Sequence, residues 1–291
     1  MHIKRSIVMY KKGLILEGGA MRGMFTAGVI DVFMENDIVF DGAVGISAGA
    51  TFGCNIKSKQ PGRVVRYNKK YCKDPRYGTI KSLIKSGDLY ENEFCYHEIP
   101  DKLDVIDRET FKDNPMEFYI GATDIRTGLC VFHLCSDCGS EDIEWMRASA
   151  SMPFVSKPVE INGRLYLDGA IADSVPYRFM EDKGYDRNVI VLTQARGYRK
   201  KNHHMSFLIN RIYKDYPALA KAYNDRHEMY NRQMTEIYER ADSGQSIVIC
   251  PPYNPDISRT EKDPYELERV YQMGRKEATK RLDEIRTFLG E

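Results

Sequence analysis

The sequence predicts an α/β protein with a mostly parallel sheet covered on both faces, followed by a C-terminal helical region. Short apolar runs alternate with helical patterns through residues 1–195. This alternation favours parallel strands connected by helices that cover both faces of the sheet. From residue 196 onward the pattern is mainly helical, and we expect this region, 196–291, to pack on the core as an extension.

The elements of the core follow from local patterns. Apolar runs of strand length end in glycine or polar residues, and helical stretches carry apolar residues at helical spacing. Asn162-Gly163, between alternating apolar residues, is a strong hairpin signal. In order, we expect a strand at 13–19, a helix at 21–37, a strand at 42–47, a helix from residue 50, strands at 117–125 and 128–136 joined by a turn at 126–128, a helix at 141–152, a hairpin within 158–170, a short helix at 175–184 and a strand at 187–193.

The C-terminal region begins with a basic, irregular stretch. A helical pattern over 205–240 follows, with a break at Pro217, and a last strand is expected over 246–253. Asp263 followed by Pro264 is typical of the start of a helix. The helix expected after them places six apolar residues on one face: Leu267, Val270, Ala278, Leu282, Ile285 and Leu289.

The composition is that of an ordinary folded protein without a strong charge bias. Of the 291 residues, 42% are hydrophobic and 29% are charged, and the formal net charge is +1. We therefore expect no global attraction to nucleic acid and no nucleic-acid partner.

Membrane insertion and export are not expected. The most apolar region, 13–34, contains Glu17, Arg22 and Asp31, and a membrane span needs about 20 mostly uncharged residues. The apolar run 7–10 is too short for a signal peptide. The seven scattered cysteines then predict reduced thiols and a cytoplasmic location.

A G-x-S-x-G sequence, Gly45 to Gly49, lies between an expected strand and an expected helix. In that context it is typical of a nucleophile elbow, a sharp turn that presents the serine, here Ser47. The turn leaves no room for Cβ atoms beside the serine, which accounts for the flanking glycines. The dipole of the following helix would stabilise negative charge at Ser47. A tight turn with a serine N-cap would give the same pentapeptide, so the motif alone does not establish catalysis.

A second glycine cluster, Gly18, Gly19 and Gly23, lies at another strand-to-helix turn. Acyl transfer requires backbone N–H groups directed at the developing oxyanion, and a glycine-rich turn at a helix N-terminus exposes such groups. The alternative, a phosphate-binding loop, is disfavoured because neither G-x-G-x-x-G nor G-x-x-x-x-G-K-[ST] is present.

Asp168 is the preferred proton acceptor for the serine. It follows an alternating strand and precedes Gly169 at a tight turn. A carboxylate shielded from water binds a proton more tightly and is a better base. The histidines lack such a context, although a His-assisted esterase that uses His203 or His227 stays an alternative.

Taken together and in this order, the motifs resemble the patatin-like phospholipase family, in its bacterial branch. The sequence EGGAMRG at 17–23 looks like the oxyanion loop of that family, GISAG like its nucleophile motif, and DGA at 168–170 like its aspartate motif. The resemblance covers about residues 13–195. It implies a three-layer α/β/α core and a Ser–Asp dyad that hydrolyses lipid acyl esters, as a phospholipase A or esterase does.

Carried over by position, the resemblance assigns roles to individual residues. It implies that Ser47 is the nucleophile and Asp168 the base, that the oxyanion donors lie among Gly18, Gly19 and Ala20, that Arg22 steadies the loop or a bound anion, and that Gly23, Gly45, Gly49 and Gly169 support the turns. Many members of the family have glycine where this chain has Ala20. Alanine keeps the N–H group, and we expect the donor to survive if φ at Ala20 is negative.

The expected partners are a lipid or acyl-ester substrate and, peripherally, a membrane surface, and no cofactor or metal is expected.

Two further alternatives differ in kind from a serine hydrolase. The first is a non-catalytic module that binds lipids or anions, for which the basic stretch Arg196–Lys201 would be the contact. The second is a metal site formed by Cys130, His133, Cys135 and Cys138, whose residue types suit zinc although their spacing is not that of paired zinc knuckles.

Overall fold

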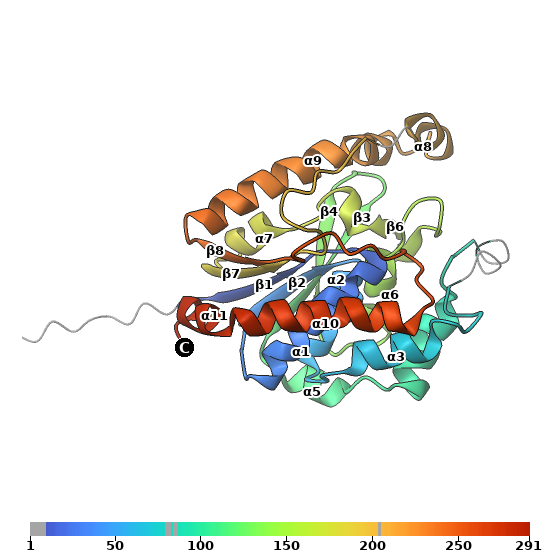
Figure 1. The fold of residues 1–291 in the computed structure, drawn as a ribbon. Coiled ribbons are helices and arrows are strands. Elements are labelled where there is room, and N and C mark those ends of the chain that lie inside the picture. Colours follow the sequence, from blue (N-terminus) through green and yellow to red (C-terminus); the bar gives the residue numbers. More distant parts are fainter. Residues whose placement is uncertain (1–9, 79–82, 84–86, 203–204) are drawn as a thin grey trace, which may run out of the picture.

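One mixed sheet of eight strands forms the centre of the protein in the computed structural model, which describes residues 10–78, 83, 87–202 and 205–291 (Figure 1). The strand order is β5 (Val159–Ile161), β6 (Arg164–Asp168), β3 (Glu117–Asp124), β2 (Gly42–Ile46), β1 (Lys12–Leu16), β7 (Arg187–Val191) and β8 (Ser246–Ile249), and β4 (Cys130–Cys135) also pairs with β3. The neighbouring strands β3, β2, β1, β7 and β8 pair in parallel. The pairs β3–β4, β3–β6 and β5–β6 are antiparallel. The mostly parallel sheet is therefore confirmed.

Helices cover both faces of this sheet, which gives three layers (Figure 1). One face carries α1 (Met24–Glu35), α2 (Ala48–Lys57), α3 (Arg63–Tyr71), α5 (Arg108–Asp113), α6 (Ser140–Ser149), α10 (Pro264–Lys280) and α11 (Leu282–Leu289), and the other carries α7 (Tyr177–Asp182) and α9 (Pro217–Asp242). Of the remaining helical segments, α8 (Ser206–Ile212) packs on α9. The segments η1 (Ala20–Gly23) and η3 (Gly169–Ile171) are short 3₁₀ helices, and η2 (Glu93–Leu103) is a π-helix. Within the described ranges, none of the helices combines the length and the apolar character needed to cross a bilayer.

The central strands are buried on both sides because successive side chains point to opposite faces. In β1, Leu14 and Leu16 belong to the larger core under α1 and α10, whereas Ile15 belongs to the core under α7 and α9. All three side chains are fully buried. This accounts for the uninterrupted apolar runs in the sequence, which are typical of parallel strands with both faces covered.

Several local predictions are confirmed. Asn162 and Gly163 adopt φ values of 51° and 74°, as expected for the central residues of a tight hairpin turn. The helical pattern after residue 205 is interrupted before Pro217, which is the first residue of α9. The Asp263 side chain accepts a hydrogen bond of 2.9 Å from the N–H of Tyr265 and so caps α10.

The expected single C-terminal helix is wrong, because the chain breaks at Arg281 into α10 and α11. Arg281 has φ −114°, outside the helical range, and its guanidinium donates to the carbonyl oxygen of Val248 in β8. This contact holds the break against the sheet. The apolar face survives on both helices, with Leu267 and Ile285 fully buried.

The C-terminal region shares the sheet and the core with the rest of the chain. Its strand β8 extends the parallel sheet next to β7. Its helix α10 crosses α1 at a point where Gly28 and Gly274 face the backbone of the opposite helix. A Cβ atom at Gly274 would overlap the carbonyl oxygen of Phe25, and one at Gly28 would overlap that of Tyr271. The boundary near residue 195 stays a prediction.

We predict that Gly274→Ala destabilises the fold by about 2 kcal/mol or more, because the added methyl group forces α1 and α10 apart. Urea unfolding of the purified protein measures the change. Lys276→Ala, an exposed substitution on the same helix, is the control and should shift the free energy of unfolding by less than about 0.5 kcal/mol. Equal stability of the two variants would contradict the proposed close crossing.

Candidate active site

The C-terminal ends of β2 and β6 meet along one edge of β3. Strand β2 runs parallel to β3 and ends with Ile46 opposite Gly121, whereas β6 runs antiparallel to β3 and ends with Asp168 opposite Ala122. Because β4 occupies the other edge of β3 over residues 118–123, β2 and β6 lie end to end. The residue after Ile46 is Ser47, so the register alone places it beside Asp168.

Ser47 occupies a strained turn between β2 and α2. Its φ and ψ angles are 55° and −121°, a conformation that a residue with a side chain rarely adopts. Its N–H donates a hydrogen bond of 2.9 Å to Oγ of Ser149, which donates one of 2.6 Å to the carbonyl oxygen of Gly121. Its own carbonyl accepts from the N–H of Thr51 in the first turn of α2. These bonds hold the turn against its strain.

The four glycines predicted to support the turns, and Gly18 of the predicted oxyanion loop, all pack closely against other groups of the chain. A Cβ atom at Gly18 would lie 2.8 Å from Cβ of Ser47, and one at Gly23 would lie 2.8 Å from Cβ of Ala48. Cβ atoms at three further positions would overlap backbone oxygens, namely Gly45 with that of Gly49, Gly49 with that of Leu16, and Gly169 with that of Gly121. Glycine is therefore required here by close approach.

Asp168 is buried at the end of β6, with only 2% of its surface exposed. Its Oδ1 accepts a hydrogen bond of 2.8 Å from the N–H of Ala170. Burial raises the pKa of Asp168 above its ordinary value, although the positive charge of Arg226, the N–H of Ala170, a hydrogen bond from the Ser47 side chain and the charge of Lys200 each act to lower it. The structure thus brings the two predicted residues into direct contact.

The loop after β1 approaches Ser47 from the neighbouring strand. The backbone of Gly18, Gly19 and Ala20 lines the same cavity as Ser47 and Asp168. In the part of the chain that the structure describes, the N–H groups of these three residues have no hydrogen-bond acceptor. They remain available to an oxygen atom in the cavity.

The condition under which the Ala20 donor was expected to survive, a negative φ, is not met. The φ of Ala20 is 49°, in the left-handed region that glycine adopts without strain and alanine adopts at a cost of about 1 kcal/mol. The turn is set by its surroundings, since Gly19 packs against the side chain of Thr193 and Gly18 packs against Ser47. Alanine therefore accepts a conformation that its own preference would avoid.

Two cavities meet at Ser47. One, of about 140 Å³, is mainly apolar and is lined by aromatic and aliphatic side chains, among them Phe52, Tyr67, Tyr96, Ile99 and Met146. The other, of about 310 Å³, contains Ser47, Asp168 and the loop Gly18–Ala20. Ala20, Ser47, Tyr90 and Ala150 line both.

The larger cavity is rich in basic side chains that sequence reasoning largely missed. Arg22, predicted as a supporting residue, lines it together with Lys200, Arg226 and Arg259. Lys200 belongs to the basic stretch noted in the sequence, but Arg226 lies on a polar helix without a motif. No local signal distinguishes Arg226 from the other arginines of α9, because only the packing of α9 directs it to the cavity.

The histidine alternative receives little support from the described residues. His203 lies outside them. His227 lies on α9, where its Nδ1 is 3.0 Å from the carbonyl oxygen of Asn224, and it lines neither of the two cavities that contain Ser47.

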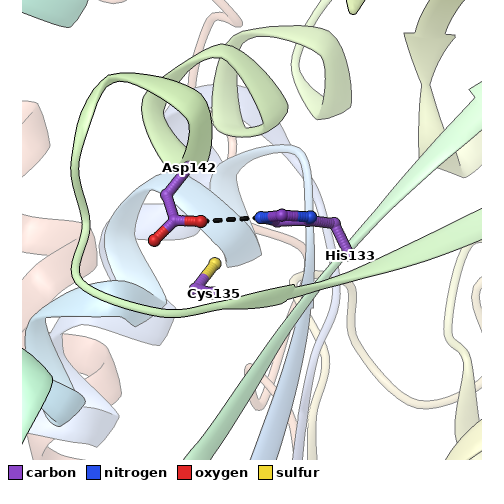
Figure 2. Close-up of side chains that lie close together, drawn as sticks. All are labelled: His133, Cys135 and Asp142. Atoms are coloured by element: carbon purple, nitrogen blue, oxygen red, sulfur yellow. Dashed lines mark hydrogen bonds and ion pairs between the residues drawn. The ribbon is translucent and has the colours of Figure 1, made fainter. Parts of the chain in front are cut away.

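The four residues proposed as a metal site do not come together as predicted. His133 and Cys135 lie on one face of β4, and the period of two along a strand directs Cys130 to the opposite face. Asp142, from α6, joins His133 and Cys135 instead, and their ligand atoms lie within 4.8 Å of one another (Figure 2).

Hydrogen bonds account for this cluster. Asp142 Oδ1 lies 2.6 Å from His133 Nε2, as Figure 2 shows, and Oδ2 accepts the N–H groups of Ser136, Asp137 and Cys138. Burial raises the pKa of the Cys135 thiol well above its ordinary value, which disfavours the thiolate that a metal requires. The cluster therefore fastens the loop between β4 and α6.

Comparisons with known proteins identify relatives of this chain. The family model described as patatin-like phospholipase matches residues 14–180, and a second model, a domain of unknown function (DUF6363), matches residues 216–290. The uncharacterized protein YjjU of Escherichia coli is 29% identical over 199 residues, 62% of this chain and 51% of that protein. The lysophospholipase NTE1 of Saccharomyces cerevisiae is 30% identical over 190 residues, 59% of this chain and 10% of that protein.

Among solved structures, the crystal structure of VipD from Legionella pneumophila aligns over 95% of this chain and 67% of that chain, with a TM-score of 0.46 and 12% identity. The sequence matches thus span about half or less of the length of the curated relatives. The first family model covers more than half of this chain and includes the serine turn, the glycine-rich loop and the aspartate described above. The chain belongs to the patatin-like phospholipase family.

Proposed function

We propose that this protein is a serine lipid acyl hydrolase of the phospholipase A or esterase type, in which Ser47 and Asp168 form the catalytic dyad. Membership of the family supports lipid hydrolysis in general. The observation that carries the specific proposal is the contact between the Ser47 hydroxyl and a buried carboxylate at the edge of a cavity. The expected substrate is a lipid or another acyl ester.

The reaction follows from these groups. Oγ of Ser47 attacks the carbonyl carbon of the ester while its proton passes to the Asp168 carboxylate. The intermediate collapses, the alcohol leaves with that proton, and an acyl-serine ester remains. Water then attacks the acyl group and gives its proton to Asp168, and Ser47 recovers it as the fatty acid is released.

Burial supports the assignment of Asp168 as the base. A carboxylate with an ordinary pKa is a poor proton acceptor for a hydroxyl, and a raised pKa improves it. Desolvation raises the pKa of Asp168, whereas the nearby charges of Arg226 and Lys200 favour its ionised form. The net shift is upward, so Asp168 is a better proton acceptor than an aspartate exposed to water.

The glycine-rich loop supplies the third part of the proposal. The N–H groups of Gly18, Gly19 and Ala20 are the proposed donors to the oxyanion that forms on the carbonyl oxygen. Backbone donors fixed in this way stabilise the transition state without a cost of reorganisation. The apolar cavity beside Ser47 has the lining expected of an acyl-chain pocket.

We predict that Ser47→Ala and Asp168→Asn each lower kcat toward a short-chain ester by at least about a thousandfold, because each removes a group that acts in the chemical step. Ester hydrolysis by the purified protein measures the effect, and thermal unfolding establishes that each variant is folded. Ser58→Ala, a buried serine at the other end of α2, is the matched control and should keep wild-type activity. Wild-type turnover in either dyad variant would refute the assignment.

The alternative of a non-catalytic lipid- or anion-binding module keeps one observation in its favour, the basic lining of the larger cavity. A binder has no need of a serine in a strained conformation, whereas a nucleophile does. Covalent labelling by a fluorophosphonate separates the two functions, since it requires an activated serine. A folded protein that is not labelled at Ser47 would favour the binding module.

We also propose that α8 contacts a membrane surface. Its outer face and the residue before it expose Met205, Phe207, Leu208 and Ile212, with 80% of Phe207 exposed. Exposed basic residues, Arg211 and Lys214, flank these side chains. An apolar face bordered by basic residues is typical of helices that lie in the interface of anionic membranes. Asn210 of α8 bonds to Asn224, two residues from Arg226 of the larger cavity, so the helix lies near the proposed site.

We predict that Phe207→Ser weakens binding to vesicles that contain anionic lipid by about tenfold or more, because burial of a phenyl ring contributes about 2 kcal/mol. Vesicle co-sedimentation measures the binding. Tyr265→Ser removes an aromatic side chain that is 83% exposed on α10 and serves as the control, with unchanged binding expected. Equal binding by Phe207→Ser and wild type would exclude α8 as the contact.

A further inference from the structure

The larger cavity beside Ser47 contains more positive than negative charge. Four basic side chains line it, Arg22, Lys200, Arg226 and Arg259, against two carboxylates, Glu17 and Asp168. A partly enclosed cavity has too little water to screen such an excess as effectively as an open surface does. With all four basic groups protonated and both carboxylates ionised, the excess is two positive charges, and a ligand of opposite charge would balance it.

The positive charges of these four side chains are not neutralised by close ion pairs within the described part of the chain. Elsewhere in the chain, Arg196 and Arg240 pair with carboxylates at 2.8 and 2.6 Å. None of the four cavity side chains forms such an ion pair with any of the described residues. Nε of Arg22 is buried without a hydrogen-bond partner among them.

The remaining contacts of these side chains orient them without neutralising them. Nε of Arg226 donates a hydrogen bond of 2.6 Å to the carbonyl oxygen of Ala170, in the turn that follows Asp168. Nζ of Lys200 lies 4.3 Å above the ring of Tyr230. These contacts help to position both side chains at the wall of the cavity.

The two carboxylates are already engaged. Oε2 of Glu17 accepts hydrogen bonds of 2.6 and 3.2 Å from the N–H and the hydroxyl of Thr193. Asp168 accepts the N–H of Ala170 and lies beside the Ser47 side chain. Neither is free to form a close ion pair with the arginines.

Burial, and after it the mutual repulsion of the basic groups, lowers the pKa values of three of them. Burial, followed by the charge of Arg226, lowers the pKa of Lys200 to about 7. Burial also lowers the pKa of the Arg22 and Arg226 guanidinium groups, and the charge of Arg259 lowers both further. An arrangement that costs the empty protein free energy in this way is typical of a binding site.

We propose that the acyl substrate carries a phosphate monoester, and that Arg22, Lys200, Arg226 and Arg259 bind this dianion while the ester lies at Ser47. Guanidinium groups bind phosphate oxygens through paired hydrogen bonds, and two excess positive charges match a dianion better than a neutral group or a singly charged diester. Three of the four residues follow residue 180, beyond the match to the patatin-like family. The C-terminal region thus selects the substrate. This inference rests on the proposed hydrolase function.

The test compares three soluble substrates with the same hexanoyl chain: hexanoylglycerol phosphate, neutral hexanoylglycerol and the corresponding phosphocholine diester. Wild type should hydrolyse the phosphate monoester with kcat/KM at least about tenfold above the other two. Lys200→Gln, Arg226→Gln and Arg259→Gln should each reduce this preference about tenfold, mainly through KM. Lys200→Arg should retain most of it.

Two features of the design keep the result decisive. Because Arg226 also holds the Ala170 turn, the exposed Arg259 provides the variant least disturbing to the fold. Arg232→Gln, an exposed arginine on the same helix α9, is the control and should leave the preference unchanged.

Equal hydrolysis of the three substrates by wild type, dependent on Ser47, would overturn the inference and leave the hydrolase proposal intact. A different result would refute the hydrolase proposal itself: hydrolysis of the neutral ester that survives Ser47→Ala. Inorganic phosphate should inhibit hydrolysis of the monoester competitively. If it instead accelerates neutral-ester hydrolysis and the monoester has no advantage, the basic groups bind free phosphate and the substrate assignment is wrong.

Discussion

The proposed site depends on one constraint, the end-to-end arrangement of β2 and β6 along the same edge of β3. The parallel strand ends at Ile46 and the antiparallel strand ends at Asp168, opposite adjacent residues of β3. Two side chains that are 121 positions apart in the sequence are thereby fixed by backbone hydrogen bonds of the sheet. Such a framework holds a hydroxyl and a carboxylate in contact more precisely than flexible loops could. It also explains why β6 arrives antiparallel in a sheet that is otherwise mostly parallel around the site.

The surroundings of this contact divide the proposed chemistry between two parts of the chain. The family core supplies the serine turn, the aspartate, the glycine-rich loop and the apolar cavity. The C-terminal region contributes a strand to the sheet, packs α10 on α1, and directs Arg226 and Arg259 to the larger cavity. The proposed bond-breaking site can thus be combined with a separate wall that would recognise the rest of the substrate. Many enzymes share a fold and differ in the residues that surround the active site.

The sequence predicted what local signals encode and missed what only packing decides. The glycines around Ser47 and the Asp-Gly turn at Asp168 are local requirements, and the expected strands and hairpins were found near their predicted bounds. The left-handed φ of Ala20 was not foreseen, because alanine carries no signal for it. The break at Arg281 was missed because the apolar face continues across it. The basic cavity was missed because its side chains come from separate segments. Arg22 and Lys200 belong to stretches noted in the sequence, but no local signal unites them with Arg226 and Arg259.

The pH dependence of Ser47 modification by a fluorophosphonate tests the dyad most directly. Burial raises the pKa of Asp168, so the base is lost as pH falls through that raised value, and we predict that the labelling rate of wild type falls there, above the ordinary Asp range of about 3.9. Asp168→Asn should label slowly and without that dependence. Asp173→Asn removes a neighbouring acid whose pKa burial raises to about 6, and this variant should keep the wild-type profile. Labelling of Asp168→Asn at the wild-type rate, or loss of the profile in Asp173→Asn alone, would contradict the dyad.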